Sequence, residues 1–144
     1  MKTVAIISSP LQLVNFKEFI HIKKIKNYYF IVLYNYDAEL SQINNLAVFY
    51  KININLVIRG NFFIQYIKLK RLKKFFFNCN NLIIGNFFSD PHLYLSNQIK
   101  PKQIYVIDDG MNTLLIHDKF KSNQKILSSN LSIDLIFLIL KMKT

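Results

Sequence analysis

Five short apolar runs alternate with four helical segments along the chain, and this alternation constrains the fold more than any other feature of the sequence. The clearest run covers residues 28–34 and is apolar throughout, as expected of a central strand in a parallel sheet. Strands that alternate with helices predict right-handed βαβ units with helices on both faces of one sheet. We therefore predict an α/β fold, a single Rossmann-like domain over residues 1–144.

The other predicted elements follow from local patterns. Strands are predicted at residues 4–7, 56–58, 82–85 and 104–107, which are rich in Val, Ile and Leu. Helices are predicted from Pro10 to about 22, from 38 to 50 behind Asp37 as N-cap, from 62 to 77, and from Pro91 to 98. A last amphipathic helix is predicted at 131–143, while residues 113–116 fit either helix or strand.

The formal net charge of +11 favours anionic partners such as nucleic acid, an acidic membrane surface or an acidic sugar. A composition rich in Lys, Asn and Ile, with lysines that only solvate the surface, explains the charge equally well. No nucleic-acid-binding motif is present, so nucleic acid is not expected as a partner. Cys79 is the single cysteine, which excludes a disulfide or a multi-cysteine metal site within the chain.

Neither end of the sequence predicts a membrane span or an export signal. The apolar run at 4–7 is shorter than the ~7–15 residues of a signal peptide. The run at 133–140 contains Asp134 and is shorter than the ~20 residues that a spanning helix needs. A cytoplasmic location is therefore expected, with peripheral contact at the inner membrane face as an option.

Ligands of parallel sheets bind at the carboxyl ends of the strands, and Ser8-Ser9-Pro10-Leu11-Gln12 follows the first predicted strand. Ser9 is a plausible helix N-cap, which is a purely structural explanation of this turn. A functional explanation is that free N–H groups and serine hydroxyls hold an anionic or polyhydroxylated ligand. The turn lacks the glycines of phosphate-binding loops, which disfavours nucleotide binding here.

The fifth predicted strand ends in Asp108-Asp109-Gly110, which contains two of only eight acidic residues. A tight turn accounts for such a tripeptide, because Asp accepts backbone N–H bonds and Gly supplies a positive φ. At a strand end that forms a cleft, a second carboxylate nearby raises the pKa of its neighbour, and such a group can act as a general base.

Two further groups of residues have both a structural and a functional explanation. His21, His92 and His117 lack metal-ligand spacing, so no metal is predicted, although His92 stands near a strand end. The helix at 62–77 carries a basic cluster that is either a solvated face or a contact surface for anionic lipid or acidic glycan. The cluster consists of Lys68, Lys70, Arg71, Lys73 and Lys74.

Three motifs together resemble the N-terminal half of bacterial sialyltransferases, of the α-2,8-polysialyltransferase-like and lipooligosaccharide sialyltransferase group. They are the segment Ser8 to Leu13 after the opening strand, Ile84-Gly85-Asn86 ahead of a late strand, and Tyr105 to Gly110. The resemblance implies the acceptor-side domain of a GT-B glycosyltransferase that transfers sialic acid from CMP-sialic acid to a capsule or lipooligosaccharide glycan.

The resemblance also implies roles for individual residues. Asp109 would be the general base of an inverting reaction that needs no metal or cofactor, and Asp108 and Gly110 would position it. Substrate-binding roles fall on the strand-end residues Ser8, Ser9, Pro10, Gln12 and Asn86.

One departure from the family pattern affects the expected activity. The His-Pro pair that contacts the CMP phosphate has no counterpart, and the only similar pair is reversed, Pro91-His92. We therefore expect a truncated or split enzyme that is inactive without a separate C-terminal half. One alternative is a non-catalytic protein that binds glycans or membrane surfaces. A flavodoxin-like phospho-accepting domain is disfavoured, because Ser8-Ser9 occupies the place of its acidic cluster.

Overall fold

A computed structural model describes residues 3–86 and 89–107 of the chain. Contacts between Cα atoms divide the chain into residues 1–112 and residues 113–144, and the fold described below belongs to the first of these units. The predicted elements at 113–116 and 131–143 lie outside the described residues. The extent of the domain over residues 1–144 stays a prediction.

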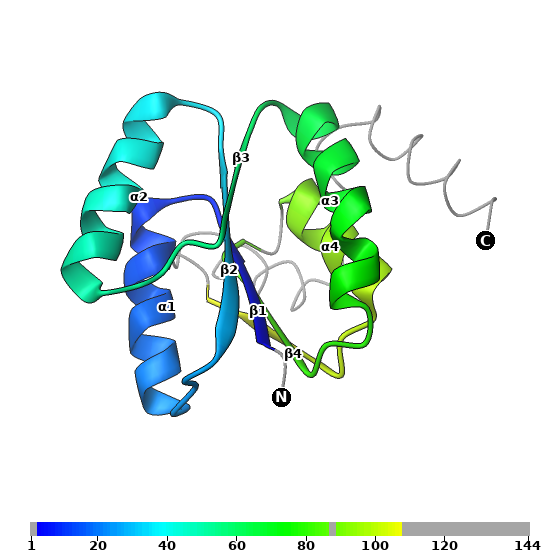
Figure 1. The fold of residues 1–144 in the computed structure, drawn as a ribbon, viewed down its shortest axis with the longest axis horizontal. Coiled ribbons are helices and arrows are strands. Elements are labelled where there is room, and N and C mark those ends of the chain that lie inside the picture. Colours follow the sequence, from blue (N-terminus) through cyan, green and yellow to red (C-terminus); the bar gives the residue numbers. More distant parts are fainter. Residues whose placement is uncertain (1–2, 87–88, 108–144) are drawn as a thin grey trace, which may run out of the picture. The chain divides into compact units, whose positions relative to one another are not determined.

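The described residues form one five-stranded sheet in which all neighbouring strands are parallel (Figure 1). The strand order is β3-β2-β1-β4-β5, so β1 lies at the centre of the sheet. This arrangement confirms the predicted Rossmann-like α/β fold. The strands are β1 (Thr3–Ile7), β2 (Tyr28–Tyr34), β3 (Leu56–Arg59), β4 (Asn81–Ile84) and β5 (Gln103–Val106).

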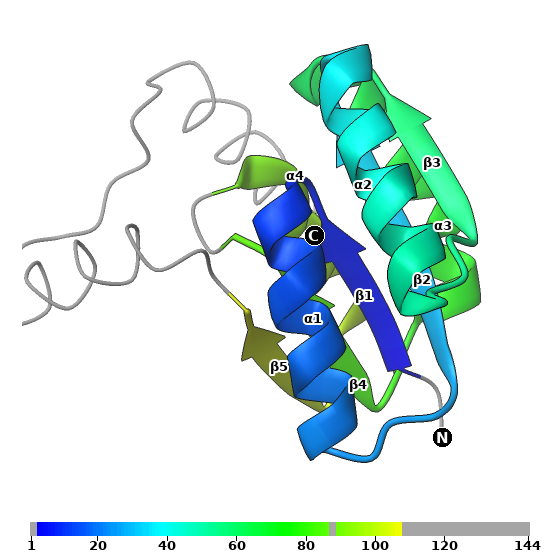
Figure 2. The same cartoon turned by 90° about the vertical axis from the view of Figure 1, so that its left-hand side faces the viewer.

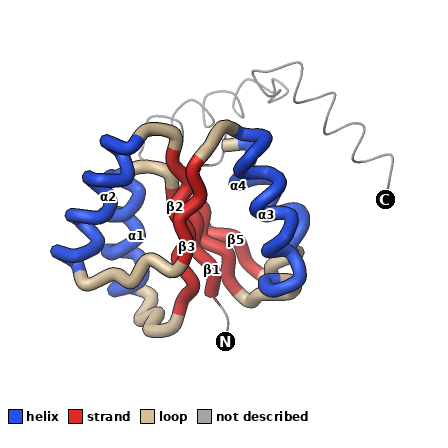
Figure 3. The backbone as a smooth tube through the Cα atoms, turned by 45° about the horizontal axis from the view of Figure 1, so that its top comes forward, coloured by secondary structure: helices blue, strands red, loops and turns tan. Residues whose placement is uncertain are grey.

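Four helices cover the two faces of the sheet and connect its strands in the predicted alternating order. Helices α1 and α2 lie side by side on one face, as Figure 2 shows, and α3 and α4 pack together on the other (Figure 3). Within the described part of the chain, no helix has the length and apolar character required to cross a membrane. The helices are α1 (Pro10–Ile22), α2 (Asp37–Tyr50), α3 (Phe62–Phe76) and α4 (Asp90–Ile99).

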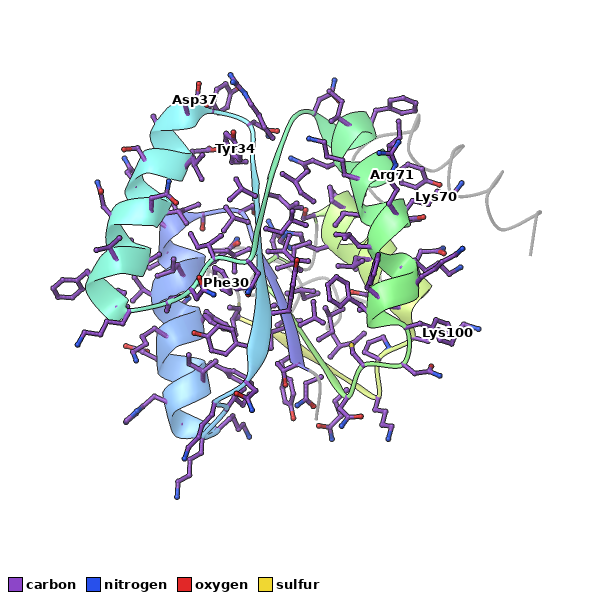
Figure 4. The ribbon with its side chains drawn as sticks, viewed as in Figure 1. Phe30, Tyr34, Asp37, Lys70, Arg71 and Lys100 are labelled. Atoms are coloured by element: carbon purple, nitrogen blue, oxygen red, sulfur yellow. The ribbon has the colours of Figure 1, made fainter. Side chains whose placement is uncertain are left out.

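The core lies between the sheet and the helices because the central strands are apolar on both faces. All five residues of β1 and all four residues of β4 are buried. Phe30 extends from β2 to α1, where its ring centroid lies 4.6 Å from that of Phe16 (Figure 4). Complete burial of a side chain of this size contributes about 1.5–3 kcal/mol. The fully apolar sequence of β2 is therefore explained by helices on both of its faces.

The predicted N-cap of α2 is wrong by one residue. Tyr36 has extended backbone angles and is the N-cap, whereas Asp37 is the first helical residue. The Asp37 carboxylate instead pairs with the Arg59 guanidinium at 3.2 Å, across the ends of β2 and β3. An acidic side chain in the first turn is also favoured by the positive end of the helix dipole. Figure 4 labels Asp37 at this end of α2.

Candidate functional site

The site predicted from the strand ends lies between β1 and β4. Here the connections that leave the two strands run to opposite sides of the sheet. The chain leaves β1 for α1 on one face of the sheet and leaves β4 for α4 on the other, although β1 and β4 are neighbours. Such a switch point is where ligands of open parallel sheets bind. Two of the three sequence motifs, Ser8 to Leu13 and Ile84 to Asn86, meet there.

The loop after β1 is held by short-range hydrogen bonds. The Ser9 hydroxyl accepts a hydrogen bond from the Gln12 N–H at 3.3 Å, which confirms Ser9 as the N-cap of α1. The side chain of Gln12 turns back, and its Oε1 accepts a hydrogen bond from the Ser8 N–H at 2.8 Å. Pro10 occupies the first turn, as predicted. Ser8 and Ser9 are half-buried, and the Ser8 hydroxyl donates to Gln12 Oε1 at 3.4 Å.

Gln12 also joins this loop to the end of β4. Its side chain, 2 % exposed, lies against Gly85 so closely that a Cβ atom on Gly85 would stand 2.5 Å from Gln12 Cδ. The Gly85 N–H continues the strand ladder by donating to the Ile6 carbonyl at 2.9 Å. A side chain at position 85 would therefore force Gln12 to move from its place against the end of β4.

His92 holds the loop after β4. Its Nδ1 accepts a hydrogen bond from the Asn86 N–H at 3.1 Å, and the ring is completely buried. Burial lowers the pKa of His92 to about 4, so the imidazole is neutral near pH 7. Because Nδ1 accepts, the proton of the neutral ring is on Nε2, which has no hydrogen-bond partner among the described residues.

The end of β5 reaches the same edge of the sheet. The Ile107 N–H donates to the Ile84 carbonyl at 2.9 Å, so the last described residue lies beside the end of β4. Asp108 follows Ile107 directly in the sequence. The predicted base Asp109 and its neighbours Asp108 and Gly110 lie outside the described residues, and their roles stay predictions.

The structure therefore brings the predicted substrate-binding residues onto one edge of the sheet. These are Ser8, Ser9, Pro10, Gln12 and Asn86. Sequence analysis missed the contact between Gln12 and Gly85, and the hydrogen bond that His92 accepts. The sequence does indicate that Gln12 is buried, because it lies four positions before Phe16 and therefore on the same, buried face of α1. No group of three or more potential metal ligands occurs in the described part.

The predicted basic cluster lies on α3, the helix that leads into β4. All five of its cations are exposed, and the Lys73 ammonium donates to Gln98 Oε1 on α4 at 2.9 Å. Buried Gln65, Leu69 and Phe76 attach the helix to the fold. The rings of Tyr66 and Tyr94, 4.3 Å apart, pack α3 against α4.

Comparisons with known proteins identify no family for this chain. No family model, curated protein or solved structure matches it. The fold and the strand-end residues define the chain as an α/β protein with a Rossmann-like parallel sheet, and its function must be inferred from the site.

Proposed function

We propose that this domain forms the acceptor side of a sialyltransferase-like glycosyltransferase. The observation that carries the proposal is that the described residues of the three motifs lie at the ends of three neighbouring strands, β1, β4 and β5. Two hydrogen bonds join these ends, one from the Gly85 N–H to Ile6 and one from the Ile107 N–H to Ile84. The described parts of these motifs, which are separated by about seventy-five and twenty residues in the chain, thus share one edge, as a common substrate site requires.

The proposed reaction is a single displacement at the anomeric carbon of sialic acid. The Asp109 carboxylate takes the proton of an acceptor hydroxyl, whose oxygen then forms the new bond to the anomeric carbon. The bond between that carbon and the CMP phosphate oxygen breaks, and CMP leaves with the electron pair. One displacement inverts the configuration and requires no metal to activate the acceptor.

The described residues supply the surface on which an acceptor glycan would be oriented. The half-buried Ser9 hydroxyl accepts the Gln12 N–H and keeps its own proton to donate, and the positive end of the α1 dipole favours an anionic sugar. Gln12 and His92 are buried and bonded to the backbone, so they fix the two loops in place. They are positioning residues in this proposal.

The test is transfer from CMP-sialic acid to galactose-terminated and sialic acid-terminated oligosaccharides. The sialyltransferases that the chain resembles hold CMP-sialic acid on a second domain. The chain is therefore assayed alone and together with the separately expressed donor-binding domain of one of these enzymes. We expect transfer only in the mixture, and Asp109→Asn should lower its rate by at least a hundredfold.

Asp118→Asn is the matched control, because it removes the same charge from another aspartate of the chain and should leave transfer unchanged. Transfer by the mixture with undiminished rate in Asp109→Asn would refute the role of the base. Absence of transfer from any mixture, together with absence of glycan binding by the chain, would refute the proposed function as a whole.

A further inference from the structure

The outer surface of α3 combines basic and apolar side chains in a pattern that the proposed function does not use. Positions 63, 67, 70 and 74 form one stripe at helical spacing, and positions 64, 68, 71 and 75 form the next. Both stripes lie on the side of the helix turned away from buried Gln65, Leu69 and Phe76. Lys70 and Arg71 extend outward from α3 in Figure 4.

Large apolar side chains stand at both ends of this surface. Phe63 is 63 % exposed and Phe75 is 69 % exposed, and both belong to the two stripes. Ile64, Ile67 and Phe77 are also exposed, and the basic side chains lie between these two apolar groups in the sequence. Exposure of this many large apolar residues on one helix is unusual for a surface that contacts only water.

The charge of the surface indicates the chemistry of its partner. Helix α3 contains five basic residues and no acidic residue. A second copy of the chain placed on the same face would bring these cations against each other, which disfavours self-association there. Residues 108–144 contain four aspartates and five lysines, so that segment offers no net negative charge to neutralise the surface.

We propose that the outer face of α3 binds the surface of an anionic lipid bilayer. The basic side chains lie at the level of the lipid headgroups, and Phe63, Ile67 and Phe75 enter the boundary between headgroups and acyl chains. The inference goes beyond the proposed acceptor site and does not depend on it. For an enzyme of a membrane-linked glycan, such contact would also bring the strand-end edge close to its substrate.

Depth of insertion is measured with tryptophan, because the chain contains none. Phe63→Trp places a single reporter on the outer face of α3. Phe49→Trp is the matched control on α2, where Phe49 is 76 % exposed on the opposite side of the sheet. With vesicles of phosphatidylcholine containing phosphatidylglycerol, we expect a blue shift and quenching by brominated lipid for Phe63→Trp only. Equal responses at both positions, or no response at position 63, would overturn the proposal.

Charge is tested by vesicle co-sedimentation of two variants with the same net charge. Lys68→Gln/Lys70→Gln/Lys74→Gln removes three cations from α3, and Lys24→Gln/Lys26→Gln/Lys51→Gln removes three exposed cations at the ends of α1 and α2. At about 1 kcal/mol per basic residue, the α3 variant should bind about a hundredfold more weakly than the wild type. The control variant should lose much less.

Binding of the wild type should also weaken with added salt and be absent from pure phosphatidylcholine vesicles. Equal loss in the two triple variants would show that net charge alone drives binding and would overturn the proposal. A protein that binds heparin but no vesicle of either composition would do the same, since the partner would then be a soluble polyanion.

Discussion

The side chain of Gln12 lies against Gly85, and this contact fixes the loop after β1 to the end of β4. Gln12 Oε1 also accepts the hydrogen bond of the Ser8 N–H, so the side chain cannot withdraw without losing that bond. One side chain thus contacts two loops that lead to helices on opposite faces of the sheet.

Gly85→Ala should destabilise the protein by about 1–3 kcal/mol, because the new methyl group overlaps a buried side chain. In the double variant Gln12→Ala/Gly85→Ala the methyl group enters the space that Gln12 leaves. We therefore expect the double variant to be more stable than the sum of the single effects predicts, by about 0.5–3 kcal/mol. Urea unfolding of the four proteins measures this coupling, and simple additivity would contradict the contact.

Ser9→Ala should cost about 1 kcal/mol of stability, because it removes the acceptor for the Gln12 N–H at the start of α1. Ser9→Asn is the matched control, since asparagine is an equally good N-cap and should retain most of the stability. Chemical denaturation of both variants provides the comparison. Equal loss in the two would show that the cap contributes little.

Stability should decrease as the pH falls from 6.5 toward 4, because His92 is buried and neutral in the folded protein. Its pKa is lowered from 6.5 to about 4, so the unfolded chain binds one more proton than the folded chain within this window. The full effect, reached near pH 4, is roughly 3 kcal/mol. Unfolding free energies measured at several pH values should show this slope.

His92→Gln removes the titrating ring and should flatten the slope between pH 4 and 6.5, even if the variant is less stable throughout. The exposed His21 on α1 supplies the matched variant, His21→Gln, which should keep the slope of the wild type. A slope that persists in His92→Gln would assign the pH dependence to other groups.

Much of the fold could be predicted because the buried strands are apolar without interruption. The predicted bounds of β2, Tyr28–Tyr34, are those observed, and the other strands differ by one residue at one or both ends. The N-cap of α2 was misplaced because both Tyr36 and Asp37 precede the helical pattern. An aspartate is the better cap in isolation, but Asp37 pairs with Arg59 on a strand that is distant in the sequence.

The candidate site was only partly predictable for a related reason. Ser9 could be assigned from the sequence, because its partner, the Gln12 N–H, is three residues away. The contact of Gln12 with Gly85 spans two elements that meet only after β1 and β4 pair. The burial of His92 depends on how α4 packs, which the reversed pair Pro91-His92 does not reveal.

The most direct test of the acceptor site is the mapping of glycan binding by two-dimensional ¹H–¹⁵N NMR of the 144-residue chain. A sialylated or galactosylated oligosaccharide is titrated into the labelled wild type and into Ser8→Ala, whose hydroxyl contributes to the proposed surface. We predict that the perturbed amides are those of Ser8, Ser9, Gly85 and Asn86, with weaker binding in the variant. Perturbations confined to α3, or none at all, would contradict an acceptor site at the ends of β1 and β4.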